Sequence, residues 1–211
     1  MPLWPHLWHD LAGYALARWR DQRSEGSVTF DIDHGVETGR WTLSGYEPTP
    51  PHLAEAVLDA QPMPSEGAAF VDVGAGKGRM LFLAARRPYA RVVGLELDAA
   101  LVEVGLRNLR EGHDPQRRSI DVQLLHADAT RCAWPTEPLV LYLYNPFDAE
   151  TLETMLGRVQ ASLAASPRAC CLAYVNPLYP KPLQARGWKR HASGGTGTGG
   201  WAWWTPPERG S

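Results

Sequence analysis

The feature that most constrains this chain of 211 residues is a glycine-rich turn between an apolar run and a helical pattern. The apolar run begins at Phe70, and the turn reads Asp-Val-Gly-Ala-Gly-Lys-Gly-Arg over residues 72–79. Glycines permit positive φ and let the backbone approach a ligand, and the helix that follows starts with unpaired N–H groups. A strand, turn and helix of this kind are typical of an α/β domain that holds a nucleotide-like molecule.

Two acids near this turn help to choose the ligand. A second apolar run, residues 91–95, ends at Glu96, where a carboxylate is placed to bind the hydroxyls of a ribose. The charge of Asp72 would repel the pyrophosphate of a dinucleotide and attract the cationic ammonium and sulfonium of S-adenosylmethionine. The glycine spacing G-x-G-x-G also departs from the dinucleotide pattern G-x-G-x-x-G. These two features count against an NAD-dependent oxidoreductase, which stays as an alternative.

These motifs resemble those of the Rossmann-like class I methyltransferases, whose first motif is an acid followed by alternating glycines and whose second strand ends in an acid. More narrowly, the turn, the later Leu-Tyr-Asn-Pro-Phe of residues 143–147 and the upstream residues 30–38 resemble a largely uncharacterised bacterial methyltransferase family. The resemblance implies S-adenosyl-L-methionine as the cofactor and leaves the methyl acceptor open. The cofactor-binding residues that it implies here are Asp72, Gly74, Ala75, Gly76, Gly78, Glu96 and Leu97.

A third strand is predicted over residues 120–126, and Asp128 and Ala129 follow it. In class I methyltransferases an acid after this strand accepts a hydrogen bond from the adenine amino group, so the resemblance implies that both residues border the adenine. An aspartate here also suits a helix cap or a turn, which stays as the alternative interpretation.

The fourth strand, residues 139–144, leads into Asn145-Pro146-Phe147-Asp148. A nearly continuous apolar strand is typical of a parallel sheet covered on both faces, and ligands lie outside the carboxyl ends of such strands. The tetrad partly resembles the Asn-Pro-Pro-aromatic motif of amino-group methyltransferases, and about equally the Asn-Asn-Phe sequence of the non-SET lysine methyltransferases. We therefore predict Asn145, Pro146 and Phe147 as catalytic residues, with nitrogen favoured as the attacking atom.

The same tetrad also has a structural interpretation. Asn145 can bond its own backbone in a turn, Pro146 can end the strand, and Asp148 can cap the next helix. For Asp148 we prefer the cap, because apolar side chains recur after it at helical spacing.

An N-terminal helix and an irregular arm are predicted over residues 1–51, because tryptophans recur at helical spacing near the start and turn formers dominate residues 24–51. In class I methyltransferases such an arm commonly covers the cofactor, so Tyr46 and Thr49 are further candidates for cofactor contact. Thr49 alternatively caps the helix that starts at the prolines after it. Residues 52–211 are expected to form a single methyltransferase domain.

The whole fold is expected to be α/β: a Rossmann-like seven-stranded, mostly parallel sheet with helices on both faces. Strand-like pieces at residues 188–191 and 201–204, separated by a glycine run, predict the antiparallel C-terminal hairpin that closes class I sheets. The N-terminal helical arm is added to this sheet.

Composition agrees with a globular enzyme, at 44% hydrophobic and 21% charged residues. A net charge of −2 gives no basic footprint, so nucleic acid is not an expected partner. The three cysteines suggest neither a metal site nor a disulfide framework, and no stretch approaches membrane-spanning length. We expect a cytoplasmic methyltransferase without metal or targeting segment, acting on an unidentified protein or small molecule. A catalytically silent cofactor-binding module is the second alternative.

Overall fold

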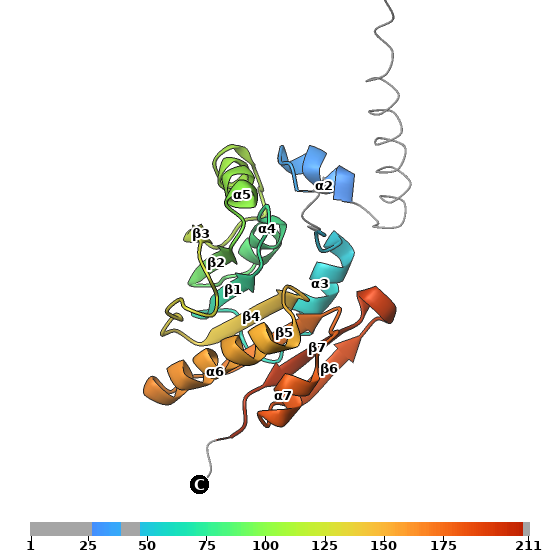
Figure 1. The fold of residues 1–211 in the computed structure, drawn as a ribbon. Coiled ribbons are helices and arrows are strands. Elements are labelled where there is room, and N and C mark those ends of the chain that lie inside the picture. The colour runs from blue at the N-terminus through green and yellow to red at the C-terminus, as the bar shows by residue number, and fades with distance from the viewer. Residues whose placement is uncertain (1–26, 39–46, 209–211) are drawn as a thin grey trace, which may run out of the picture.

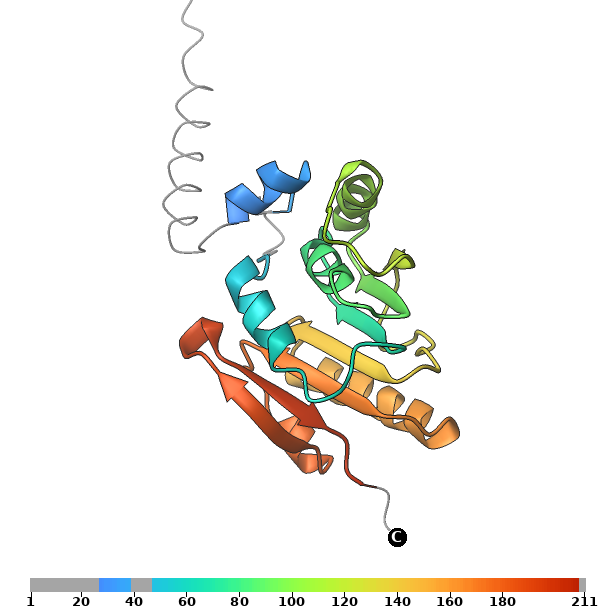
Figure 2. The same ribbon diagram turned by 180° about the vertical axis from the view of Figure 1, so that it is seen from behind.

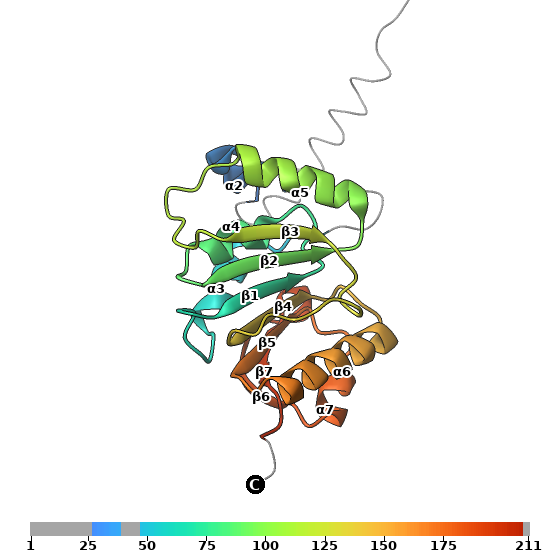
Figure 3. The same cartoon turned by 90° about the vertical axis from the view of Figure 1, so that its left-hand side faces the viewer.

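The structure is a computed structural model that describes residues 27–38 and 47–208 (Figure 1). The predicted helix near the start of the chain and Tyr46 lie outside these residues. One sheet of seven strands, in the order β3-β2-β1-β4-β5-β7-β6, forms the centre of the molecule (Figure 3). The strands are β1 Ala69–Val73, β2 Arg91–Glu96, β3 Val122–His126, β4 Leu139–Tyr144, β5 Cys170–Val175, β6 Lys189–Gly194 and β7 Trp201–Thr205.

The strand directions confirm the predicted Rossmann-like sheet. Strands β1 to β5 run parallel to one another, whereas β7 is antiparallel to both β5 and β6. The third strand begins two residues later than predicted, at Val122, because Ile120 lies outside the sheet with 92% of its surface exposed. The carboxyl ends of β1, β2 and β4 meet at one edge of the sheet, and this edge positions the site.

Helices cover both faces, as predicted (Figure 2). One buried cluster joins the sheet to the first four described helices, and the other joins its opposite face to the last two. In β5, Cys171 belongs to the first cluster and Cys170 to the second, as expected for adjacent residues of a strand. The helices are α2 Ser27–His34, α3 Pro51–Asp59, α4 Arg79–Ala85, α5 Ala99–Glu111, α6 Ala149–Ala165 and α7 Lys181–Ala185, and a short 3-10 helix, η1 Gly197–Gly199, precedes β7.

The prediction of an irregular arm over residues 24–51 is wrong where α2 stands. This short helix has little periodicity of its own, and tertiary contacts stabilise it. Phe30 is buried, and its ring stacks on His34 at a centroid distance of 4.2 Å. Nδ1 of His34 bonds the Phe30 carbonyl at 2.8 Å, and Nε2 bonds Arg86, the C-cap of α4, at 2.8 Å. Packing against α4 therefore decides the structure of a segment whose own sequence is ambiguous.

Candidate cofactor and acceptor site

The glycine turn between β1 and α4 follows the predicted pattern in detail. Gly74, Gly76 and Gly78 all have positive φ, at 79°, 54° and 86°. A Cβ at Gly74 would lie 2.8 Å from the Cβ of Pro146, so the turn packs directly against the end of β4. Glycine at position 74 is thus required both by backbone conformation and by space.

Glu96, at the end of β2, is fixed by backbone N–H groups on two sides. Its Oε2 accepts from the Gly76 N–H at 2.8 Å. Its Oε1 accepts from Leu97 and Asp98, at 2.8 and 2.9 Å. Asp98 in turn caps α5 by accepting from the Ala100 N–H at 2.8 Å. These contacts hold the Glu96 carboxylate beside the glycine turn.

Asp72 is the most unusual ionisable group of the site. It is 3% exposed, and no residue in the described part of the chain donates a hydrogen bond to its carboxyl group. Burial, and secondarily the negative charge of Glu96, raises the pKa of Asp72 to about 8. A buried carboxyl group without a partner favours a cationic ligand, because a cation would supply the missing counter-charge.

Two cavities meet at this turn. The first has a volume of about 390 Å³ and the second about 600 Å³, and Gly74, Glu96 and Pro146 line both. Gly76 and Gly78 shape the turn without lining either cavity. Of the predicted residues, Thr49, Asp72, Gly74, Ala75, Glu96, Asn145 and Pro146 line the first cavity, and Gly74, Glu96, Leu97, Asp128, Ala129, Pro146 and Phe147 line the second.

The second cavity combines an apolar surface with a carboxylate. Leu97 is 68% exposed there, and Ala129 is buried. Asp128 Oδ1 accepts from the Thr130 N–H at 2.8 Å and the Thr130 hydroxyl at 2.6 Å. The Thr130 hydroxyl, and then the Thr130 N–H, hold the pKa of Asp128 below its usual range. Asp128 therefore forms the local turn that we considered and also lines the cavity with an ionised group.

The Asn-Pro-Phe segment lies at the end of β4, between the two cavities. Asn145 has a left-handed backbone with φ of 41°. Its Oδ1 accepts from the Tyr174 hydroxyl at 3.0 Å, so a β5 side chain orients the amide. Asp148 accepts from the Thr151 N–H at 2.8 Å and caps α6, which confirms the preferred structural interpretation of that residue.

Arg79 is a site residue that our sequence analysis missed. It is 2% exposed, and its Nε donates to the Thr38 hydroxyl at 2.7 Å. Its Nη1 donates to the Thr49 carbonyl at 3.3 Å, and its Nη2 lies 3.5 Å from the Asp31 carboxylate. The available signal was its place directly after the glycines. An arginine in a first helical turn nevertheless resembles an ordinary surface residue, because its partners are distant in sequence.

Lys77 and Asn108 connect Glu37, which follows α2, to the glycine turn. Lys77 Nζ lies 3.1 Å from a carboxylate oxygen of Glu37. The Asn108 amide accepts from the Glu37 N–H at 2.9 Å and donates to the Lys77 carbonyl at 3.0 Å. The lysine in the glycine turn is thus paired with the arm, which agrees with the absence of a phosphate-loop motif around it.

Thr49 does not cap a helix, so that alternative is wrong. Helix α3 begins at Pro51 with Pro50 as its N-cap, and no side chain bonds this end. The Thr49 hydroxyl is instead 2.9 Å from the hydroxyl of Tyr142, and both residues line the first cavity. Buried tertiary contact outweighs the local capping preference here.

Two kinds of feature are absent from the described residues. No helix within residues 27–38 and 47–208 is long and apolar enough to cross a membrane. In the same part of the chain, no three histidine, cysteine, aspartate or glutamate side chains come together as a metal site would require.

The strand order, the antiparallel last strands and the glycine turn flanked by two acids define the fold of the class I, Rossmann-like methyltransferases, which confirms the predicted resemblance. Over 153 residues the chain is 31% identical to the ribosomal protein L11 methyltransferase of Desulforapulum autotrophicum. The match covers 72% of this chain and 46% of that protein, so the chain spans about half the length of this curated relative. No protein-family model matches the sequence.

Solved structures agree on the fold. The ribosomal protein L11 methylase of Lactobacillus delbrueckii subsp. bulgaricus superposes with a TM-score of 0.53 at 14% identity, over 78% of this chain and 81% of that one. The precorrin 8w decarboxylase of Methanobacterium thermoautotrophicum gives a TM-score of 0.55 at 18% identity, over 80% and 96% of the two chains. Proteins with different names share this fold, so the function must be argued from the site.

Proposed function

We propose that the chain is an S-adenosylmethionine-dependent methyltransferase. The observation that carries this proposal is the buried Asp72 carboxyl group, which faces the first cavity beside the glycine turn without a hydrogen-bond donor among the described residues. A methionyl ammonium would stabilise the ionised form of this carboxyl group, whereas a pyrophosphate would disfavour that form further. The strand order supports the same choice, because β7 lies between β5 and β6, unlike the 3-2-1-4-5-6 order typical of dinucleotide folds.

The residues present fit this cofactor in size and chemistry. Both cavity volumes lie within the range of about 300–1,000 Å³ typical of small-molecule sites. In the proposed arrangement Glu96 holds the ribose hydroxyls and Asp72 holds the ammonium. Leu97 offers an apolar surface to the adenine, with Asp128 and Ala129 at its edge. The arm within residues 1–51 would cover the cofactor, and residues 52–211 would form the domain that binds it.

The chemistry asks little of the protein beyond positioning. When bound, S-adenosylmethionine would supply an activated methyl group to an acceptor nitrogen, S-adenosylhomocysteine would be the leaving group, and the proton of the methylated nitrogen would pass to solvent. Asn145 and the Pro146 carbonyl would orient that nitrogen at the end of β4, and Phe147 would border it. Burial, and then the charge of Glu47, raises the pKa of Tyr144 to about 12, so this tyrosine stays protonated and does not act as a base near neutral pH.

The acceptor is proposed as a nitrogen of a protein side chain, with a small molecule as the second candidate. The curated relative is named as a methyltransferase of a ribosomal protein, and this name supports a protein acceptor. We also propose a cytoplasmic location, where cysteines stay reduced, because Cys132, Cys170 and Cys171 are all free in the structure.

Calorimetric titration with S-adenosylmethionine, S-adenosylhomocysteine and NAD tests the proposal. Micromolar binding of the first two, and none of NAD, is the expected result. Binding of NAD alone would overturn the role of Asp72 and the proposal with it. Binding of S-adenosylmethionine without methyl transfer to any protein or amine in a broad acceptor screen would favour a silent binding module.

Replacing Glu96 by alanine should weaken S-adenosylmethionine binding at least tenfold, because hydrogen bonds to a charged group contribute roughly 1.5–3 kcal/mol each and about 1.4 kcal/mol is a factor of ten. Calorimetry measures the change, and thermal unfolding checks the fold. The variant Glu96→Gln keeps the length of the side chain but only one acceptor oxygen, so it should weaken binding less than alanine does while losing the charge and the N–H contacts on one side. The exposed Glu103 on α5 provides the matched control, Glu103→Ala. Unchanged affinity in both Glu96 variants would remove Glu96 from the site.

A further inference from the structure

The dipeptide Asn-Pro occurs at the ends of two neighbouring strands. Asn145-Pro146 follows β4, and Asn176-Pro177 follows β5. These strands are parallel, with the residue before each asparagine paired in register. The two asparagines therefore lie side by side at the edge of the sheet where the first cavity opens, and both line that cavity.

Both asparagines have an unusual backbone. Asn145 and Asn176 have φ of 41° and 47°, and no other non-glycine residue in the described part of the chain has a positive φ. A residue before proline normally adopts an extended conformation. Left-handed residues other than glycine persist where the surroundings fix them, and they cluster at functional sites. The same unfavourable geometry thus occurs twice, at two adjacent positions of one cavity.

The side chains of the two residues differ in their partners. The Tyr174 hydroxyl already donates to Asn145 Oδ1 at 3.0 Å, and the Tyr179 N–H lies 3.4 Å from the same hydroxyl. Asn176 donates its backbone N–H to the Gly200 carbonyl at 2.7 Å. Within residues 27–38 and 47–208, no hydrogen bond reaches the side-chain amide of Asn176. Asn176 therefore has both an acceptor oxygen and an NH₂ group available for a ligand.

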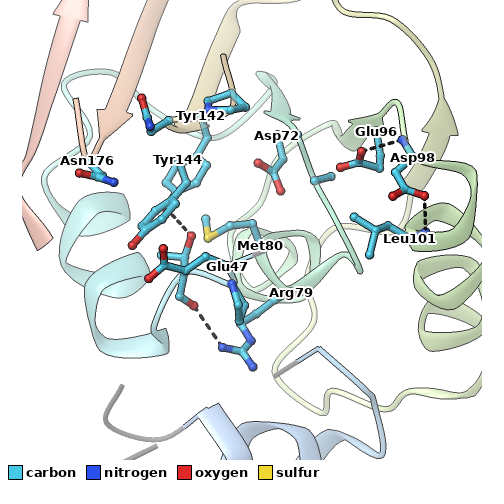
Figure 4. A pocket seen from close by; sticks show the side chains of 16 residues that line it. Glu47, Asp72, Arg79, Met80, Glu96, Asp98, Leu101, Tyr142, Tyr144 and Asn176 are labelled. Carbon is cyan, nitrogen blue, oxygen red and sulfur yellow. Dashed lines mark hydrogen bonds between the residues drawn. The ribbon is translucent and has the colours of Figure 1, made fainter. Parts of the chain in front are cut away.

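The position of Asn176 indicates which ligand that is. Figure 4 shows Asn176 and Tyr144 at one end of the first cavity, Glu96 and Asp98 at the other, and Asp72 between them. The ribose and ammonium are assigned to the Glu96 and Asp72 side, so the Asn176 end remains for the methyl acceptor.

We propose that Asn176 is a second acceptor-binding residue, whose amide oxygen accepts a hydrogen bond from the attacking amine beside Asn145. This inference rests on the proposed function. A nitrogen that donates a hydrogen to Asn176 can direct its lone pair toward the methyl group, and a hydroxyl or carbon acceptor would gain less from two side-by-side amides. The acceptor class is therefore an amine, and Asn176 contributes to that selectivity.

Sinefungin tests this assignment without knowledge of the acceptor, because it carries an amine-bearing carbon in place of the methylsulfonium of S-adenosylmethionine. The quantity measured is the ratio of dissociation constants for S-adenosylhomocysteine and sinefungin. The wild-type protein should prefer sinefungin. Asn176→Gly should reduce the preference at least fivefold, since glycine keeps the left-handed backbone and removes only the amide. Asn176→Asp also tolerates this backbone and should increase the preference, because a carboxylate attracts the ammonium.

The control is Leu178→Ala, an exposed neighbour in the same loop that lines neither cavity, and its ratio should equal that of wild type. Loss of the preference in Asn176→Gly with unchanged S-adenosylhomocysteine affinity would support the inference, because a merely structural role would alter both ligands together. An unchanged ratio in both Asn176 variants would overturn it and leave the proposed function standing. Failure of the wild-type protein to bind S-adenosylhomocysteine at all would instead contradict the proposed function.

Discussion

Asp72→Asn should bind S-adenosylmethionine roughly 10- to 150-fold more weakly than wild type while unfolding at a higher temperature. The loss of affinity follows from about 1.5–3 kcal/mol for a hydrogen bond to a charged group. The gain in stability follows because the unliganded protein buries this carboxyl group without a hydrogen-bond donor among the described residues. Asparagine keeps the shape of the side chain and removes the cost of burying its charge.

The stability difference should depend on pH in a defined direction. The pKa of Asp72 is about 8 in the folded protein, against about 3.9 in an unfolded chain. Between these values the folded state holds one more proton than the unfolded state, so wild-type stability falls as pH rises and levels off above pH 8. The melting temperature of Asp72→Asn should therefore equal that of wild type near pH 4 and exceed it progressively toward pH 8.

Cofactor affinity supplies the matching measurement. S-adenosylmethionine should bind wild type more tightly as pH rises from 6 toward the pKa of about 8, and below that pKa binding should release a proton. Calorimetry in buffers of different ionisation enthalpy measures this proton. Asp33→Asn, a change at an exposed acid, should alter neither quantity. A lower melting temperature for Asp72→Asn at pH 8 would show that the carboxylate is stabilised in the folded state and would contradict our account.

Gly74→Ala should lose cofactor binding and destabilise the domain, and Gly67→Ala provides a control with almost the same backbone. Their φ values are 79° and 74°. The left-handed backbone therefore lowers the free energy of unfolding of each alanine variant by a similar amount, roughly 1–2 kcal/mol. A Cβ at position 67 meets nothing within 4 Å, whereas at position 74 it would lie 2.8 Å from Pro146. The difference between the two variants therefore isolates the contact between the glycine turn and the end of β4.

Thermal or urea unfolding of both variants, together with S-adenosylhomocysteine titration, checks this prediction. We expect Gly67→Ala to bind the ligand like wild type despite its lower stability, and Gly74→Ala to bind at least tenfold more weakly, because a shift of about 1.4 kcal/mol has that effect. Equal stability and equal binding in the two variants would show that the turn and Pro146 can separate without cost.

The parts of the fold that the sequence predicts well depend on local patterns. The apolar run of β4 has the predicted bounds, residues 139–144, because a central parallel strand is buried on both faces and tolerates few polar residues. The order of glycines and acids identifies the turn and Glu96 for a similar reason, since both are set by spacing along the chain. The predictions fail where partners distant in sequence decide the outcome, as at α2 and Thr49.

The missed site residues follow the same rule. Arg79 bonds Thr49, 30 residues away in sequence, and Asn108 bonds Glu37, 71 residues away. The spacing of residue types along the sequence carries no information about such distant contacts. Asn176 is different, because Asn-Pro after a strand is visible in the sequence twice. Its significance depends on β4 and β5 being neighbours, which is a property of the sheet rather than of either segment.

The bonds of Lys77, Arg79 and Asn108 to Glu37 and Thr38 couple the glycine turn to residues 31–38, which belong to the described part of the arm. Any ligand that favours one arrangement of the turn must also favour the matching arrangement of the arm, and this coupling is reciprocal. The arm then contributes to ligand residence time even where it makes no ligand contact. Release of a spent cofactor is correspondingly expected to depend on the rate at which these bonds open, and not on the strength of ligand contacts alone.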